Sequence, residues 1–424
     1  MADPVTEIDV DLNTQEVLLA ASQHDIAKLR RLLRANDAAG NPANVKDPET
    51  GYSPLHAAIA ACEPDEEEEV KSNGVQTNGD GQTRGQESTV EAAVQTVKLL
   101  LQEGAIWNDL DLNNETPGCI AKRLGLTELY DMVVDAGVRA ELLLNRLDGY
   151  EQLSDEEMEE DGEQEQEQQD AAAEASVTNT AEDESVPQLV DTTAAAPPQT
   201  AESEPSVTSS RYLNSDLTFQ QDRLLDQDQN GVMMAWESDI MANSAKQLLP
   251  TPGLRVLNVG HGMGIVDGFI QEQSPSAHHI IEAHPSVVAE MKRKGWHEKP
   301  GVVIHEGKWQ DILPGLVAEG VMFDAIYYDT FAESYADFRE FFTEQVIGVL
   351  EQEGKWSFFN GMGADRQISY DVYQKVVEMD LFEAGFDVEW EEIDVPKLEG
   401  EWNGVRRPYW SIDKYRLPLC KYMD

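Results

Sequence analysis

The feature that most constrains the fold is the alternation of short apolar runs with amphipathic stretches from Tyr212 to the C-terminus. The runs are rich in β-branched and aromatic residues and predict strands: RVLNVGHG at 255–262, HHIIEAH at 278–284, GVVIHEGKW at 301–309, FDAIYYDT at 323–330 and KWSFFNG at 355–361. The amphipathic stretches between them, such as 285–296 and 334–354, predict helices. This alternation predicts a doubly wound α/β sheet, and the last runs, 385–396 and 409–419, predict a closing antiparallel pair.

Residues with ligand-binding chemistry follow the predicted strands directly. In a doubly wound sheet, ligands bind at the carboxyl ends of the strands, near the point where the strand order reverses. The residues there are Gly260, Gly262 and Gly264 after the first strand, Glu282 at the end of the second, Lys308 and Trp309 after the third, Asp329 after the fourth and Asn360 after the fifth. Glycines let the backbone approach a ligand, and an acid 22 positions after Gly260 suits the hydroxyls of a ribose. We therefore expect a nucleoside-binding site.

The glycine pattern by itself is compatible with NAD and with other nucleosides. Position 265 is Ile where a dinucleotide-binding motif has its third glycine, and the sequence has no G-K-[ST] motif to hold a triphosphate. S-adenosylmethionine has a ribose and an adenine but no phosphate, and its sulfonium is cationic. Because acids at the rim suit such a cation, we expect S-adenosylmethionine as the cofactor.

Six motifs between positions 232 and 366 are much more specific than the glycines: VMMAWESDIM, VLNVGHGMGIVDGFI, HHIIEAHPSVVAEMKRKGW, EGKWQDILP, IYYDTFAESYADF and SFFNGMGADR. With these motifs, the chain from about Tyr212 onward resembles guanidinoacetate methyltransferase and, more closely, the type IV protein arginine N5-methyltransferases of fungi. The resemblance implies a Rossmann-like class I methyltransferase domain over 211–424. It also implies a large-subunit ribosomal protein as the substrate, and residence in the cytoplasm and the nucleus.

The resemblance implies roles for individual residues of the cofactor site. The loop from Gly260 to Ile265 would wrap the methionine part of the cofactor, Glu282 would hold the ribose, and His284 would lie beside the adenine. The full set of implied cofactor-binding residues is Tyr212, Met233, Met241, Gly260, His261, Gly262, Met263, Gly264, Ile265, Glu282, Ala283, His284, Trp309, Gln310 and Asp329. His261 replaces an aromatic residue of the small-molecule enzyme, and the methionines suit a core as well as a cofactor wall.

Two acids match the carboxylates that grip the guanidino group in these families, Asp329 in YYDTF and Glu237 in AWES. A guanidinium has a pKa above ~12 and presents a planar fork of donors, so a carboxylate can hold it through two hydrogen bonds. We assign proton acceptance to Asp329 and orientation of the fork to Glu237. The small-molecule relative methylates the nitrogen that bears the carbon chain, which corresponds to the δ (N5) nitrogen of arginine. Asn360 either lies near the substrate or caps a turn with Gly361.

Two similar helical units precede this domain, at 14–62 and 90–137. Ser53-Pro54-Leu55-His56 and Thr116-Pro117 resemble the T-P-L-H-x-A signature of ankyrin repeats, in which the hydroxyl caps a helix and the His ties neighbouring turns together. We expect a small all-α ankyrin-like domain over 1–147, interrupted by a flexible insertion at 63–88. Its concave face either binds a protein partner or only buttresses the C-terminal domain.

The charge of the chain is strongly acidic, with 81 Asp and Glu, 31 Lys and Arg and a formal charge of −50. Residues 148–210 contain 19 acids and no base, and 63–88 contain 8 acids and 2 bases, so about half of the excess lies in two low-complexity stretches. The first of these is expected to be a disordered linker. An acidic surface argues against direct binding to nucleic acid or membranes and favours a basic protein substrate, with association that weakens as salt rises.

The three cysteines are far apart and form no C-x-x-C pair, which predicts a reducing compartment and no metal site. The N-terminus is acidic and lacks the pattern of a targeting peptide. We also expect the protein to be a monomer. The resulting hypothesis is an S-adenosylmethionine-dependent protein arginine N5-methyltransferase. The alternatives are a methyltransferase for small guanidino compounds and a non-catalytic scaffold with the same fold.

Overall fold

The computed structural model describes residues 12–34, 40–64, 80–147 and 207–423. The chain divides into two compact units, one of residues 1–139 with 204–424 and one of residues 140–203. The described part of the second unit is 140–147, the end of a helix. The predicted acidic linker lies outside the described residues as far as position 206. No helix within the described ranges is long and apolar enough to cross a membrane.

The described residues before position 148 are helical, as predicted. They form α1 (Leu12–Ser22), α2 (Ile26–Arg34), η1 (Pro42–Asn44), α3 (Pro54–Ala60), α5 (Asp80–Gln102), α6 (Pro117–Arg123) and α7 (Thr127–Leu147). Ser53 and Thr116 cap α3 and α6 through their hydroxyls, with Pro in the first turn of each helix. The His56 ring contacts the Ser53 hydroxyl at 2.8 Å and the Glu115 carbonyl at 3.1 Å. The prediction that His56 ties neighbouring turns together is therefore confirmed.

Two predicted boundaries differ from the structure. Helix α5 begins at Asp80, so residues 80–88 of the expected flexible insertion are helical, because extending an existing helix costs less than starting one. The predicted helix 334–354 ends early, as α14 (Tyr335–Glu340), the π-helical turn η4 (Phe341–Gln345) and α15 (Val346–Val349). Leu350 already belongs to a strand and pairs with Phe323, and this pairing outweighs the helix propensity of the residues that follow.

The C-terminal sheet has seven strands in the order β6-β5-β4-β7-β8-β10-β9. Its strands are β4 (Arg255–Val259), β5 (Ala277–Glu282), β6 (Val302–Glu306), β7 (Phe323–Tyr328), β8 (Leu350–Phe358), β9 (Phe386–Asp394) and β10 (Lys414–Tyr422). Strands β4 to β8 run parallel, while β10 lies antiparallel between β8 and β9. This arrangement is the predicted doubly wound sheet with its closing antiparallel pair, and the strand order reverses between β4 and β7.

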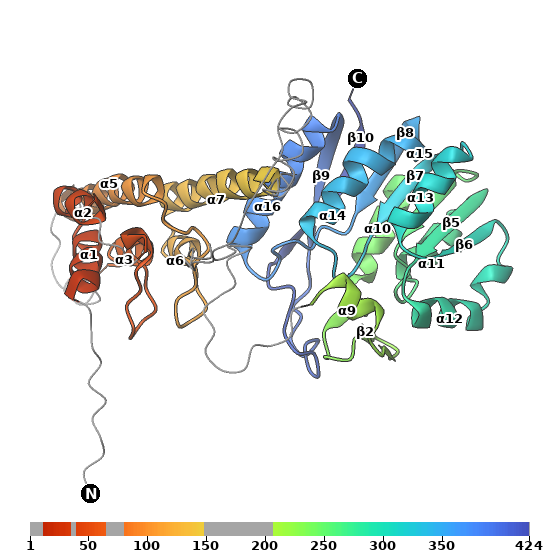
Figure 1. Ribbon diagram of the computed structural model, residues 1–424, viewed down its shortest axis with the longest axis horizontal. Coiled ribbons are helices and arrows are strands. Elements are labelled where there is room, and N and C mark those ends of the chain that lie inside the picture. Colours follow the sequence, from red (N-terminus) through yellow and green to blue (C-terminus); the bar gives the residue numbers. More distant parts are fainter. Residues whose placement is uncertain (1–11, 35–39, 65–79, 148–206, 424) are drawn as a thin grey trace, which may run out of the picture. The chain divides into compact units, whose positions relative to one another are not determined.

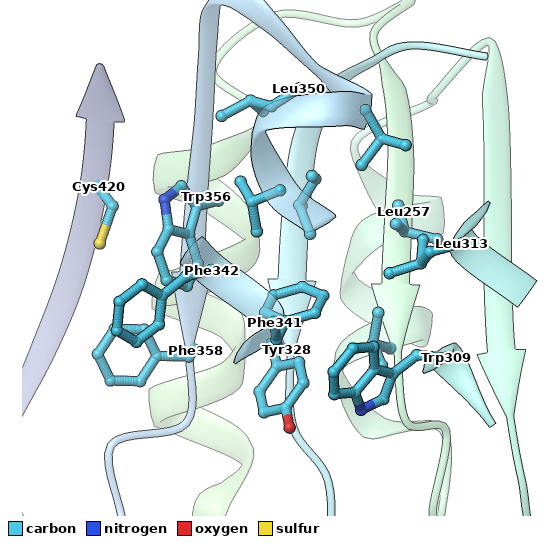
Figure 2. Packing of buried hydrophobic residues seen from close by; sticks show 14 of the residues in the cluster. Leu257, Trp309, Leu313, Tyr328, Phe341, Phe342, Leu350, Trp356, Phe358 and Cys420 are labelled. Carbon is cyan, nitrogen blue, oxygen red and sulfur yellow. The ribbon is translucent and has the colours of Figure 1, made fainter. Parts of the chain in front are cut away.

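Helices cover both faces of this sheet (Figure 1). The first face packs against α10 (Ser238–Leu248), α11 (Ile265–Glu272) and α12 (Pro285–Arg293), and η3 (Trp296–Glu298) follows α12. The second packs against α13 (Trp309–Ala318), α14, η4, α15 and α16 (Gln367–Glu383). Figure 2 shows the aromatic core on the second face, where the Trp309 nitrogen and the Tyr328 hydroxyl lie at the same end of the cluster. The two helical layers place the carboxyl ends of the parallel strands at one edge of the core.

A small antiparallel sheet, absent from the sequence-based expectation, precedes the large one. It consists of β1 (Thr218–Phe219), β2 (Arg223–Leu225) and β3 (Gly231–Met234), preceded by α9 (Ser209–Leu213) and followed by η2 (Ala235–Glu237). Its turn at 226–230 contains Asp226, Asp228 and Asn230, residue types that favour turns and could have indicated it. The hairpin carries Met233 and leads directly into Glu237, so it positions two of the predicted site residues.

Candidate functional site

A cavity lies at the carboxyl ends of β4, β5 and β7, where the strand order reverses. Eight of the predicted cofactor-site residues line it: Tyr212, Met233, Gly260, Gly262, Glu282, Ala283, Trp309 and Asp329. Ten lining residues were not predicted as cofactor contacts: Ser209, Leu213, Val232, Val259, Ile281, Gly307, Lys308, Thr330, Phe331 and Glu333. The strand ends, the segment before β1 and the β2–β3 hairpin thus converge on one space, which we call the first cavity.

The glycine loop after β4 needs its glycines for close approach. Gly260 has φ +95°, and a Cβ there would lie 1.9 Å from the carbonyl oxygen of Asp329. Gly262 has φ +55°, and its Cβ would lie 2.7 Å from the terminal methyl carbon of Met233. Side chains at these two positions would push the β7 end and the hairpin away from the loop. The glycines therefore allow the walls of the first cavity to close on one another.

Glu282, at the end of β5, is held by the same loop. Its carboxylate accepts hydrogen bonds from the backbone N–H of His261 at 2.9 Å, of Gly262 at 3.3 Å and of His284 at 2.7 Å. A carboxylate offers about four acceptor positions, so one is left for a ligand. Glu282 is thus fixed in orientation while it lines the cavity, which is the geometry needed to accept a ribose hydroxyl.

Seven predicted residues do not line the first cavity: Met241, His261, Met263, Gly264, Ile265, His284 and Gln310. Met241 is fully buried in the core beneath the hairpin, so it is a core residue, which was the alternative to a place in the cofactor wall. His284 caps α12 and contacts the carbonyl of Tyr212 at 3.1 Å, so it supports the cavity wall from behind. Met263 contributes its backbone N–H, which donates to the sulfur of Met233 at 3.2 Å.

His261 turns away from the cavity into a buried polar cluster. Its Nδ1 lies 2.6 Å from the carboxylate of Asp267, and Nε2 of His278 approaches the same carboxylate at 2.9 Å. Asn258 donates to it at 2.8 Å. Burial alone would raise the pKa of Asp267, but the charges and hydrogen bonds of the two histidines lower it below its usual range. Asp267 therefore stays ionised and anchors the glycine loop.

Glu333 lines both cavities and was missed by sequence reasoning. Its carboxylate accepts the indole N–H of Trp309 at 3.0 Å, the Thr330 hydroxyl at 2.8 Å and the hydroxyl of Tyr328. It ties the start of α13 to the end of β7 and to the residues after it. An acid four positions beyond Asp329 in the same post-strand segment was the available signal.

A second cavity adjoins the first and shares Asp329, Thr330 and Glu333 with it. Its remaining walls are largely apolar and come from the ends of β7 and β8, α14 and α16: Tyr328, Ser334, Phe338, Phe358, Phe359, Asn360, Gly361, Met362 and Val377. Asn360 is one of these lining residues, so a place near the substrate stays a prediction that its position allows. Asp329 therefore stands in the wall that the two cavities share.

Asn360 is held in one orientation by the residues behind it. Its Nδ2 donates to the Tyr370 hydroxyl and to the Arg416 carbonyl, both at 3.1 Å, and its backbone N–H donates to the Tyr415 hydroxyl at 2.9 Å. Among the described residues, no group donates to its amide oxygen. Because Asn360 is 4% exposed and lines the second cavity, that oxygen is an acceptor available to a ligand.

The two predicted catalytic acids both resist ionisation, and the charge of Asp329 acts on Glu237. Burial, and then the charge of Asp267, raise the pKa of Asp329 to about 7. Burial and the charge of Asp329 raise the pKa of Glu237 well above its usual value. Glu237 is 3% exposed, lines neither cavity and accepts a hydrogen bond from the Tyr409 hydroxyl. Two neighbouring carboxylates that resist ionisation are a site suited to a cation, which removes the repulsion between them.

No group of three or more His, Cys, Asp or Glu among the described residues could hold a metal ion. The polar residues that line the first cavity include three acids, Glu282, Asp329 and Glu333, and one base, Lys308. This balance favours a cationic ligand that carries hydroxyl donors.

Comparisons with known proteins agree on one family. A family model described as guanidinoacetate N-methyltransferase matches residues 208–400. Over 426 residues, the chain is 97% identical to a protein of Emericella nidulans named protein arginine N-methyltransferase 2, with 100% of both chains covered. The protein of that name from Aspergillus fumigatus is 74% identical over 431 residues, also with 100% of both covered. The one from Yarrowia lipolytica is 39% identical over 382 residues, covering 78% of this chain and 80% of the relative.

Proposed function

The chain belongs to the protein arginine N-methyltransferase 2 family, and from this we propose that it uses S-adenosylmethionine to monomethylate the δ nitrogen of arginine in a basic protein. As its substrate we propose a ribosomal protein of the large subunit. The observation that carries the proposal is the position of Asp329 in the wall shared by the two cavities. Glu237 is close enough for the charge of Asp329 to raise its pKa.

The residues of the first cavity fit S-adenosylmethionine. Glu282 has an acceptor position free for a ribose hydroxyl, and Trp309 and Tyr212 provide aromatic walls. The three carboxylates suit a positive charge, and the absence of side chains at Gly260 and Gly262 leaves the backbone accessible. When bound, the cofactor supplies an electrophilic methyl group on a positively charged sulfur.

Asp329 and Glu237 bind the guanidinium of the arginine, and Asp329 accepts its proton. A guanidinium that enters beside Asp329 neutralises the mutual repulsion of Asp329 and Glu237, and its planar fork can donate to both carboxylates. The attacking nitrogen must lose one proton, and Asp329 accepts it. A carboxyl with a pKa of about 7 is well matched to this task, because it is partly ionised at neutral pH and can also hold the proton afterwards.

The choice of the δ nitrogen rests on the similarity to guanidinoacetate N-methyltransferases over residues 208–400. In guanidinoacetate, the nitrogen that bears the carbon chain corresponds to the δ nitrogen of arginine. The second cavity supports the same orientation, since its apolar walls suit the aliphatic part of the arginine and Asn360 offers an acceptor. With the chain of the substrate in that cavity, its δ nitrogen would be presented at Asp329.

We further propose that the N-terminal helices support this substrate site. The Tyr130 hydroxyl on α7 donates to Asp371 on α16 at 2.6 Å, and Arg416 on β10 donates to the same carboxylate at 2.8 Å. Arg416 also contacts Asn360 through its carbonyl, at 3.1 Å. A continuous set of hydrogen bonds therefore joins α7 to a residue of the second cavity.

The test is methyl transfer from labelled S-adenosylmethionine to a basic ribosomal extract. The wild-type enzyme is expected to label a protein band, Asp329→Asn to label it at least a hundredfold more slowly, and Asp387→Asn, an exposed acid on β9, to behave as wild type. Label found in small guanidino compounds but in no protein would favour the small-molecule alternative, and no transfer at all would favour the scaffold.

A further inference from the structure

The segment between β9 and β10, residues 395–413, is fastened across the Glu237 side of the site. Its Arg406 N–H donates to the Gln229 carbonyl at 2.8 Å, and its Asn403 carbonyl accepts from the Arg223 side chain at 2.8 Å. Both partners belong to the β2–β3 hairpin region. Near its C-terminal end, the Ser411 N–H donates to the Ala364 carbonyl at 2.8 Å. The segment is thus held at its middle and near its C-terminal end by elements that flank the candidate site.

This segment places the Tyr409 side chain next to Glu237. The Tyr409 ring packs edge-on against Trp402 at 4.9 Å and lies 6.0 Å from the Trp236 ring, between centroids. It also lies against the backbone of the hairpin, where a Cβ on Gly231 would come within 2.9 Å of its Cε1 atom. Since the ring is fixed on several sides, its hydroxyl has one position, and there it donates to the Glu237 carboxylate.

We propose that Tyr409 is a positioning residue for the methyl transfer reaction, which holds the Glu237 carboxylate in the orientation that receives the guanidinium. The inference rests on the proposed function. A glutamate side chain has three rotatable bonds, and a fixed donor removes most of that freedom before the substrate arrives. A carboxylate has about four acceptor positions, so the hydrogen bond from Tyr409 leaves room for guanidinium donors.

Tyr409 also favours the ionised form of Glu237. The titratable groups around that carboxylate are Tyr327 from β7, Asp329 just after it, Tyr415 from β10 and Tyr409 itself. Burial and the charge of Asp329 raise the pKa of Glu237, and hydrogen bonds from Tyr409 and from the Met234 backbone oppose that rise, that of Tyr409 first. Without the hydroxyl, a smaller fraction of Glu237 is ionised at a given pH, so the acidic limb of the pH profile moves to higher pH.

The experiment compares full-length wild type with Tyr409→Phe in methylation of the ribosomal extract, across pH, with kcat and KM for both substrates. Loss of a hydrogen bond to a charged group predicts a fall of about tenfold to hundredfold in kcat/KM for the protein substrate. The acidic limb is expected to move up in pH, while the KM for S-adenosylmethionine stays within about twofold.

Two further variants separate positioning from folding. Gly231→Ala removes no polar group but pushes on the Tyr409 ring, and it is expected to lower kcat/KM in the same direction. Tyr422→Phe removes a hydroxyl that contacts the Leu350 carbonyl at 3.4 Å, away from both cavities, and is expected to match wild type.

Active wild type together with a Tyr409→Phe enzyme whose kcat/KM and pH profile are unchanged, or whose kcat/KM rises, overturns the inference alone. Wild type that labels no protein overturns the proposed function, and the role of Tyr409 falls with it.

Discussion

Replacing Asp329 with Asn should abolish most activity and, at the same time, stabilise the folded protein at alkaline pH. The pKa of Asp329 is raised to about 7, first by burial and then by the charge of Asp267. The ionised carboxylate is required to accept a proton, so wild-type kcat/KM should rise with its ionised fraction, and the ionisation of Glu237 makes the rise steeper. With a pKa of about 7, the ionised fraction of Asp329 is about 0.1 at pH 6 and about 0.9 at pH 8, which predicts a rise of at least about ninefold.

The raised pKa of Asp329 also makes the folded protein less stable as pH rises, whereas activity increases. Between about pH 4 and pH 7, the folded chain keeps a proton on Asp329 that the unfolded chain has already lost. The free energy of unfolding therefore decreases as pH rises through this window, by up to about 4 kcal/mol for a shift of about three pKa units. An Asn at this position does not ionise, so Asp329→Asn should unfold at a higher temperature than wild type at pH 8, with a smaller difference at pH 5.

The assays are initial rates of methyl transfer between pH 5.5 and 9 and thermal unfolding of both proteins at pH 5 and pH 8. Asp387→Asn, which replaces an exposed acid, controls for the change of net charge. A flat rate profile from pH 6 to 8 would refute the assignment of Asp329 as the proton acceptor. So would an Asp329→Asn enzyme with more than a tenth of wild-type activity.

Three other substitutions test the walls of the first cavity. Gly260→Ala places a Cβ 1.9 Å from the Asp329 carbonyl oxygen at φ +95°, so it should lower the free energy of unfolding by at least about 1 kcal/mol and weaken cofactor binding. Thermal melts and calorimetry measure these two effects, and unchanged values would contradict the close approach of the loop to Asp329. Glu282→Gln should raise the dissociation constant for S-adenosylmethionine about tenfold or more in calorimetry, and unchanged affinity would remove Glu282 from the ribose site. Glu333→Gln should raise the KM for S-adenosylmethionine several-fold, because it loosens Trp309, and an unaltered KM would mean that Glu333 has no part in shaping the cavity.

Much of the C-terminal domain could be predicted because its strands and their terminal residues are local patterns. Gly260, Glu282 and Asp329 all follow apolar runs, and parallel strands bring their carboxyl ends to one edge. The parts that could not be predicted depend on contacts between distant segments. Leu350 left the predicted helix because it pairs with β7, and Tyr409 reaches Glu237 across 172 positions of sequence.

The orientation of individual side chains also could not be predicted from the sequence. His261 stands in the glycine loop, but its ring turns toward Asp267, because a buried carboxylate requires partners. Met241 is on the correct helix but on its core-facing side. The resemblance placed Met241 in the cofactor pocket, and only the packing of that helix against α11, β8 and β10 decides which of its faces reaches a ligand.

The most direct test of the central claim is the position of the methyl group on the product. Protein from the ribosomal extract, methylated by the full-length enzyme, would be digested and the modified arginine fragmented by mass spectrometry. The account predicts a single methyl group on the δ nitrogen, formed by wild type and lost with Asp329→Asn. A methyl group on a terminal nitrogen, or δ-methylarginine formed equally well without the Asp329 carboxylate, would contradict it.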